Sequence, residues 1–393
     1  MKKYRPYLFF LPFYISLLIG FYFNEDNLGK ASFDALYHFD MSKKFNENFF
    51  ETFLLFGSDN PGYATRNSPI FWIFLSFINK FLNYEIIRLL HTLSLFLIAI
   101  TLYRCLELKF KTTNNSYLLV LASIVFLSPT LRSLAIWPYT LLWGLYFFIL
   151  SVYYYLRFKE NINFSNSLKI LIPVIISSYI YPSFAVFYIF YLFKIYSRNR
   201  DILLILKILF ISFLLSLPCL YYIFSRDILS DFQSAQGLNV SLTNSLNISN
   251  KILIISSILF YLLIPIINFE EVFRKLKTIN KFSLLIILLF CGINFYFFNF
   301  PYSIWGGGFF HKLSNVIFDN NYLFFIFSFF SILIIYLILE KRFSNYLLLI
   351  LFIIYNPQFT IYIKYFDPLV LITFLTLFDF NLKKHFFDYK YSN

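Results

Sequence analysis

The sequence predicts an all-α membrane protein with about 12 transmembrane helices. Of its 393 residues, 59% are hydrophobic and only 13% are charged, whereas soluble domains carry about 25% charged residues. Apolar runs such as 7–23 and 322–339 reach the length of about 17 to 25 residues with which a helix crosses a bilayer. Composition and run length together exclude a soluble protein.

The first expected helix covers residues 7–23 and follows the basic residues Lys2, Lys3 and Arg5. Its end lacks the small residues that a signal-peptide cleavage site requires. We therefore expect this helix to remain as the first span, with the amino terminus in the cytoplasm.

Eleven further apolar stretches follow at intervals along the chain. The expected spans are 7–23, 86–106, 117–132, 139–157, 168–181, 183–197, 202–224, 252–268, 283–300, 322–340, 345–360 and 367–380. With the amino terminus inside, 22 of the 33 Lys and Arg residues fall on the cytoplasmic side, as the positive-inside rule requires. The sequence thus predicts a multi-pass membrane protein with both termini cytoplasmic. The net charge of +13 then needs no nucleic-acid partner.

The outside of this single transmembrane domain, residues 1–393, holds three loops: 24–83, 225–251 and 301–321. Within the first loop, the apolar segment 69–82 is too short to span. We expect it to be a juxtamembrane helix at the interface.

The stretch "GKASFDALYHFDMSKKF", residues 29–45, has the spacing of a short amphipathic helix. Asp34 and His38 stand four residues apart and can interact on one face. Phe33, Leu36 and Phe39 fall mainly elsewhere and are expected to rest on the interface. One face of this helix carries Lys30, Asp34, Tyr37, His38 and Met41.

A second helix start is expected at "TRNSPIFW", residues 65–72. Asn67 or Ser68 suits the cap and Pro69 suits the first turn. Because helix starts favour anions and Arg66 adds a cation, this segment is a candidate phosphate site.

The order of these features resembles the GT-C superfamily of polytopic glycosyltransferases, in the protein mannosyltransferase and aminoarabinose transferase branch. "SFDALYHF" matches the family's Asp-Glu motif at Asp34, with Ala35 in place of Glu, and "NSPIFW" matches its second motif at Pro69. "LSPTLRSLAIWPYTLLWGLYFFIL" and "TIYIKYFDPLVLITFLTL" resemble a Pro-containing hairpin and the closing helices of the family.

The resemblance implies a bacterial inner-membrane enzyme of cell-envelope polysaccharide biosynthesis. It implies that a sugar on a polyprenyl phosphate is transferred to a glycan or lipid acceptor at the outer face of that membrane. It implies Asp34 as the catalytic base, with Glu25, Asp26 and Asp59 as substitutes. Arg66 is the first candidate for the phosphate. The other candidate substrate-binding residues are His38, Asp59, Arg132, His311, Lys312 and Lys364. No cofactor is expected and no His, Asp and Glu spacing marks a metal site, although a divalent ion is compatible with this chemistry.

Two other functions fit parts of the sequence. Arg226 and Gly237 in the second outside loop have the Arg-x10-Gly spacing of O-antigen polymerases. A lipid-sugar flippase or another transporter would place charged residues near the middle of its spans, and the expected spans hold few of them.

Overall fold

The computed structural model describes residues 5–27, 31–58, 60, 62–63, 68–111, 116–225, 247–264, 267, 269–302, 306–356 and 361–380. Helices dominate these residues, which form no β-strand beyond two isolated bridges. The chain divides into two compact units, Met1–Ser241 and Leu242–Asn393, which are treated separately below. The division into two units does not test the prediction that residues 1–393 form a single transmembrane domain, which stays a prediction.

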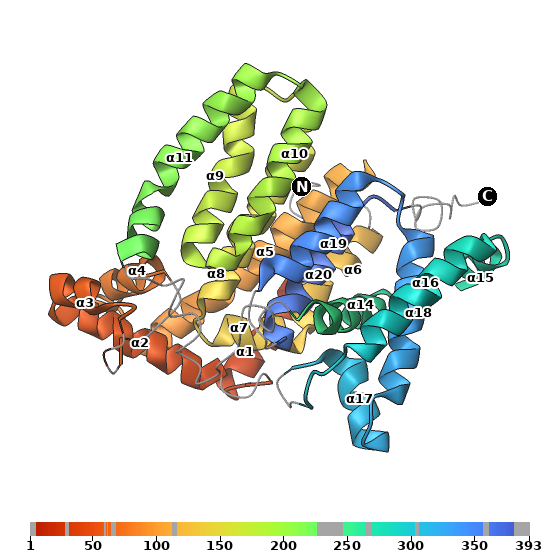
Figure 1. The fold of residues 1–393 in the computed structure, drawn as a ribbon. Helices are drawn as coiled ribbons and strands as arrows, with labels where there is room; N and C mark the ends of the chain where they lie inside the picture. Colours follow the sequence, from red (N-terminus) through yellow and green to blue (C-terminus); the bar gives the residue numbers. More distant parts are fainter. Residues whose placement is uncertain are drawn as a thin grey trace. The chain divides into compact units, whose positions relative to one another are not determined.

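Unit 1 contains the long helices of the amino-terminal half (Figure 1). The helices that fall within expected spans are α1 (Arg5–Tyr22), α5 (Tyr84–Phe110), α6 (Ser116–Leu127), α8 (Thr140–Phe158), α9 (Phe164–Ile180), α10 (Phe187–Asn199) and α11 (Ile202–Ser225). Between them lie α2 (Ala31–Glu47), α3 (Phe49–Leu55), α4 (Ile70–Asn79), α7 (Pro129–Ile136) and the 3₁₀ turn η1 (Pro182–Val186). Figure 1 shows α2, α3 and α4 gathered beside one end of α8 to α11.

Unit 2 is built from the carboxy-terminal helices. They are α14 (Ile248–Leu263), α15 (Phe269–Lys277), α16 (Lys281–Tyr296), α17 (Gly308–Phe318), α18 (Tyr322–Ile338), α19 (Phe343–Tyr355) and α20 (Ile363–Thr376). The helix α14 packs against α16, α17, α18, α19 and α20, and it is buried over most of its length. It therefore forms the centre of this unit.

Three helices are long and apolar enough to cross a membrane by themselves: α5, α8 and α11, the last over Ile202–Tyr221. Two bent pairs, α6 with α7 and α15 with α16, raise the number to five if each pair is one span. Several other apolar helices are shorter, from 10 to 17 residues. The helices thus give the chain the character of a membrane protein that its composition predicts.

The third expected span, 117–132, is not straight in the structure. The helix α6 ends at Leu127, and α7 leaves at an angle of 63°. Pro129 cannot continue a helical hydrogen-bond pattern, and the Ser128 side chain instead caps the new helix by accepting the Leu131 N–H. The turn brings the residues of α7 against α1 and α5.

Each unit has two distinct ends. In unit 2, Asn250 at the start of α14 hydrogen bonds with Asn299 after α16, and Gly306 bridges Tyr362 before α20. At the other end, Lys275 of α15 reaches the Leu337 carbonyl of α18, and Leu339 bridges Phe380 after α20.

In unit 1, Arg88 near the start of α5 lies against Asn24 after α1, while Arg104 near the end of α5 hydrogen bonds with Tyr7 near the start of α1. The helices α1 and α5 therefore run in opposite directions in unit 1, as do α14 and α16 in unit 2.

Candidate functional site

The loop between α1 and α2 is held to its surroundings at each of its residues from Asn24 to Asn27. Asp26 caps α2, because its carboxylate accepts the N–H groups of Ala31 and Ser32 at 3.2 and 3.0 Å and the Ser32 hydroxyl at 2.9 Å. A carboxylate at a helix start both satisfies open N–H groups and interacts favourably with the helix dipole. Asp26 is thereby engaged in fixing the start of α2.

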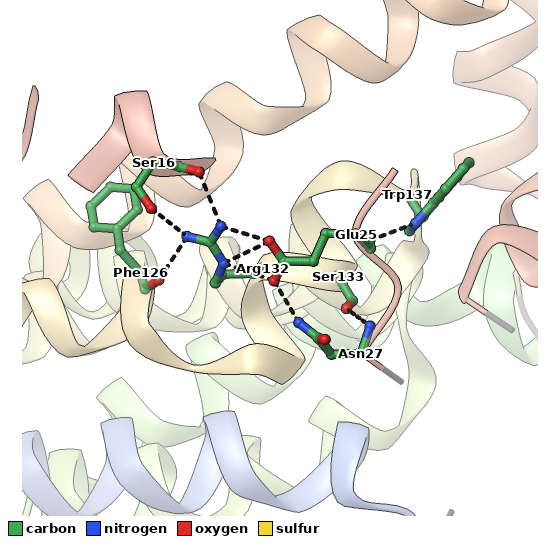
Figure 2. Close-up of polar contacts among 7 residues, drawn as sticks. All are labelled: Ser16, Glu25, Asn27, Phe126, Arg132, Ser133 and Trp137. Carbon is green, nitrogen blue, oxygen red and sulfur yellow. Dashed lines mark hydrogen bonds and ion pairs between the residues drawn. The ribbon is translucent and has the colours of Figure 1, made fainter. Parts of the chain in front are cut away.

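The side chain of Glu25 forms an ion pair with Arg132 of α7 (Figure 2). Arg132 Nη2 lies 2.6 Å from Glu25 Oε2, and Nε lies 2.8 Å from Oε1. The remaining guanidinium donors reach the Ser16 carbonyl and hydroxyl and the Phe126 carbonyl. This bidentate contact is the strong form of an arginine–carboxylate interaction. Through Arg132 it connects the loop to both α1 and α7.

The backbone of the same loop is also fixed by α7 and its end. Ser133 Oγ accepts the Asn27 N–H at 2.8 Å, and Trp137 Nε1 donates to the Glu25 carbonyl at 3.0 Å, as Figure 2 shows. Gly20 of α1 makes room for the ion pair, since a Cβ there would lie 2.2 Å from Glu25 Oε2 and 2.8 Å from Arg132 Nη2. A larger residue at Gly20 would displace the pair.

Arg88 of α5 is the most important member of this network that the sequence did not reveal. Its side chain is only 4% exposed. It donates to both Glu85 oxygens, to Asn24 Oδ1 at 2.9 Å and to the Ile136 carbonyl. The guanidinium carbon also lies 3.7 Å from the centre of the Trp137 ring, a cation–π contact. The one sequence signal for this contact is that Arg88 lies within an apolar segment, where a charged side chain typically pairs with another polar group.

The face of α2 that packs inward differs from the expected polar face. Its buried residues are Ala31, Ala35, His38, Met41, Ser42 and Phe45. Phe33 and Leu36 are 68% and 47% exposed, whereas Phe39 is partly buried against a cluster of α4 and α5 residues. His38 and Met41 are buried because α4 packs along this face of α2, and the small Ala31 and Ala35 side chains permit close approach. His38 is therefore a core residue of the loop, and its role as a substrate-binding residue stays a prediction.

Aromatic rings surround the imidazole of His38. The centres of the Trp72 and Tyr139 rings each lie 5.1 Å from it, and the Phe71 ring lies 5.9 Å away. Met41 continues the contact into a cluster with Phe45, Phe56 and Trp72. The aromatic contacts of His38 thus join α2, α4 and the residue that precedes α8.

Asp34 lies in the first turn of α2 and is half-buried. The Asp26 cap and the tethered loop precede it, and His38 follows one turn later on the same helix. Its carboxylate is thus carried by a helix that is fixed at its start and along its inner face. Asp40 of the same helix is exposed and forms an ion pair with Lys43 at 3.6 Å.

The second expected helix of the loop begins one residue later than predicted. The helix α4 starts at Ile70 with Pro69 at the cap position, and the Ser68 hydroxyl accepts the Ile70 N–H at 3.4 Å. Arg66, Asn67 and Asp59 lie outside the described residues. The candidate phosphate site at Arg66 therefore stays a prediction. The same is true of the polymerase-like pair Arg226 and Gly237.

Other predicted residues have clear surroundings. Arg132 is engaged by Glu25, Ser16 and Phe126 and is 15% exposed, so the structure gives it an anchoring contact within the chain. His91 of α5 is a packed core histidine. It is 5% exposed, it lies 3.0 Å from the Leu134 carbonyl, and it accepts Trp143 Nε1–H.

His311, Lys312 and Lys364 belong to unit 2, where the starts of α17 and α20 lie together. Gly306 bridges Tyr362, and the Gly307 N–H donates to the Ile361 carbonyl at 3.1 Å. Gly307 has a φ of +84°, and a Cβ there would meet His311 Nδ1 at 2.3 Å. Glycine is required at this position by its backbone conformation and by the imidazole packed against it.

The imidazole of His311 is fully buried beside the rings of Phe298, Phe300 and Phe324, with ring centres 5.2 to 5.7 Å away. Neither ring nitrogen has a hydrogen-bond partner among the described residues. Burial, together with the neighbouring Lys312 charge, lowers the pKa of His311 from 6.5 to about 4. His311 is therefore neutral at physiological pH.

We expect the stability of the protein to rise with pH between about 4 and 6.5 because of His311. In this window the unfolded chain binds a proton at His311 that the folded chain rejects, so acid favours unfolding. The thermal midpoint in detergent, measured from pH 4 to 7, should show this slope in the wild type. His311→Phe should remove that part of the slope, and equal slopes in both proteins would contradict the assignment.

No three His, Cys, Asp or Glu side chains in the described part of the chain come together as a metal-binding group. Comparison with known proteins adds no relative, because no protein-family profile, curated protein or solved structure matches this chain.

Proposed function

We propose that this chain is an inner-membrane glycosyltransferase that moves a sugar from a polyprenyl-phosphate carrier to a glycan or lipid acceptor at the outer membrane face. The proposal rests on the sequence resemblance to GT-C enzymes. The observation that carries it is the fixation of α2, which holds Asp34 next to a loop whose four residues 24–27 are each bonded to neighbouring helices or to α2 itself.

The positions of the helices and of the charged residues support the proposed arrangement of about 12 spans. Each of the 12 apolar stretches contains a helix, although only three to five pass the length and hydropathy criteria for a span. The predicted cytoplasmic residues Arg198 and Glu160 pair at one end of unit 1, whereas α2 follows α1 at the other end. This distribution supports the proposal that α2 lies on the side opposite the cytoplasm.

The proposed chemistry needs a base and a site for negative charge. The acceptor hydroxyl attacks the anomeric carbon, a new C–O bond forms, and the bond between that carbon and the carrier's phosphate oxygen breaks. Asp34 takes the hydroxyl proton, which typically accelerates such a step by about 10²- to 10⁴-fold. A cation stabilises the leaving phosphate, with Arg66 as the first candidate.

The fixed position of α2 matters because a base contributes only when it is held in reach of the reacting proton. The Glu25–Arg132 pair and the Asp26 cap restrain the start of the helix, and the His38 contacts restrain its inner face. In this proposal, His38 and Arg132 act through the position of Asp34. Direct contact of these two side chains with the substrate is not required.

Turnover by the purified full-length protein tests this function. Proteoliposomes are supplied with a panel of radiolabelled sugars on polyprenyl phosphate together with a membrane-lipid or glycan fraction as acceptor. We expect labelled product to form and free polyprenyl phosphate to be released, both at least tenfold above liposomes that lack the protein. Movement of the labelled carrier across the bilayer without release of polyprenyl phosphate would instead show a flippase.

A further inference from the structure

The end of unit 2 that carries α15 presents cations and aromatic side chains together. The helix α15 is bent by 111° from α16, so the two helices run roughly perpendicular to each other. If α16 crosses the membrane, α15 lies along its surface. An amphipathic helix in this position typically buries its apolar residues at the level of the lipid headgroups.

Contacts between the helices bring the basic residues of this end close together. Lys275 reaches the Leu337 carbonyl at the end of α18, and Leu276 packs with Leu337 in one cluster. Leu284 of α16 and Tyr336 of α18 pack in the same cluster, and Lys341 Nζ lies 5.1 Å from the centre of the Tyr336 ring. The end of α15, the start of α16 and the residues after α18 thus form one surface. We name this surface the α15 patch and define it by Phe273, Lys277, Lys281, Phe282, Lys341 and Phe343.

The three lysines of the α15 patch are exposed, and none forms an ion pair with a carboxylate of the described chain. Neighbouring cations differ in this respect: Lys275 pairs with Glu271 at 3.3 Å, and Arg342 pairs with Glu340 at 2.7 Å. The protein therefore neutralises some cations of this end and leaves Lys277, Lys281 and Lys341 available to an external anion.

The three phenylalanines of the patch are exposed beside these lysines. Phe273, Phe282 and Phe343 are 61%, 66% and 62% exposed. Each stands within four residues of a patch lysine in the sequence. At a membrane surface the lipid phosphates lie above the acyl chains. Lysines without a carboxylate partner can bind the phosphates, and the exposed rings beside them can contact the acyl chains.

We propose that the α15 patch binds anionic glycerophospholipids, with the headgroup phosphates at Lys277, Lys281 and Lys341 and the acyl chains against the three phenylalanines. The patch lies on the side that the distribution of Lys and Arg assigns to the cytoplasm, where anionic lipids attract basic residues. This inference does not depend on the glycosyltransferase activity, because none of the patch residues is a candidate for the proposed sugar chemistry.

Native mass spectrometry of the full-length protein in detergent tests this inference with two defined lipids, palmitoyl-oleoyl phosphatidylglycerol and palmitoyl-oleoyl phosphatidylcholine. We expect the wild type to retain phosphatidylglycerol with at least tenfold higher affinity than phosphatidylcholine. Each lysine near an anionic surface contributes about a fivefold gain in affinity. The triple variant K277Q/K281Q/K341Q should therefore bind phosphatidylglycerol about 100-fold more weakly.

Two matched variants control for charge and folding. K277R/K281R/K341R keeps the charges and should retain the lipid. K80Q/K111Q/K207Q removes three exposed lysines elsewhere and should bind phosphatidylglycerol as the wild type does. Equal retention of both lipids by the wild type would overturn the proposal. So would unchanged binding by the glutamine triple variant at an unchanged thermal midpoint, or an equal loss in the K80Q/K111Q/K207Q control.

Discussion

Replacing Asp34 by Asn is expected to lower the turnover number for polyprenyl-phosphate sugar by about 10²- to 10⁴-fold. Asn has nearly the same size and keeps hydrogen-bonding capacity, but it cannot accept the proton of the acceptor hydroxyl. Because Asp26 caps α2 and Glu25 anchors the preceding loop, the helix should stay in place in this variant. The KM for the donor should therefore change much less than the turnover number.

Asp40→Asn provides the matched control for this result. Asp40 lies on the same helix, is exposed, and pairs only loosely with Lys43 at 3.6 Å. The same chemical change there should leave turnover within about twofold, because exposed ion pairs contribute little. Equal turnover in the Asp34→Asn variant and the wild type would remove Asp34 as the base. Asp59, which lies outside the described residues, would then be the next carboxylate to replace.

The sequence predicted the positions of the helices well because membrane segments leave strong signals. Long apolar runs, Pro129 and the basic clusters are local features, and each sets a helix or its end without reference to distant residues. The short helix at 70–79 and its separation from the spans were predictable for the same reason. Its cap was misplaced by one residue, which is the usual uncertainty of helix ends.

The anchoring network was not predictable, because its members are distant in the sequence. Glu25 and Arg132 are 107 positions apart, and Asn24 and Arg88 are 64 positions apart. Nothing local distinguishes Glu25 from Asp26, yet one forms an ion pair and the other caps a helix. The burial of His38 was not predictable either, because periodicity shows which residues share a face and does not show which neighbouring helix covers that face. Only the packing of α4 on α2 decides that question.

Breaking the Glu25–Arg132 pair is expected to destabilise unit 1 by about 2–4 kcal/mol in the Glu25→Gln variant. The loss of one partner from a buried pair costs about 3–5 kcal/mol, chiefly because the other charge remains without compensation, and the side chains are 15% and 19% exposed, which reduces the effect somewhat. The free energy of unfolding in mixed micelles measures it. Arg132→Gln should show a similar loss, and the double variant E25Q/R132Q should lose less than the two single losses added together.

The same pair connects stability with the proposed catalysis, since the loop that it anchors leads directly into the helix of Asp34. Glu25→Gln should therefore also lower turnover, whereas Lys43→Gln, which breaks an exposed pair on α2, should alter stability by less than about 1 kcal/mol. Gly20→Ala keeps both charges but places a methyl group where Glu25 Oε2 now lies, so it should reproduce the effect of Glu25→Gln. If Glu25→Gln were no more destabilising than Lys43→Gln, the ion pair would not be what holds α2, and the position of Asp34 would have to depend on the Asp26 cap and the His38 contacts alone.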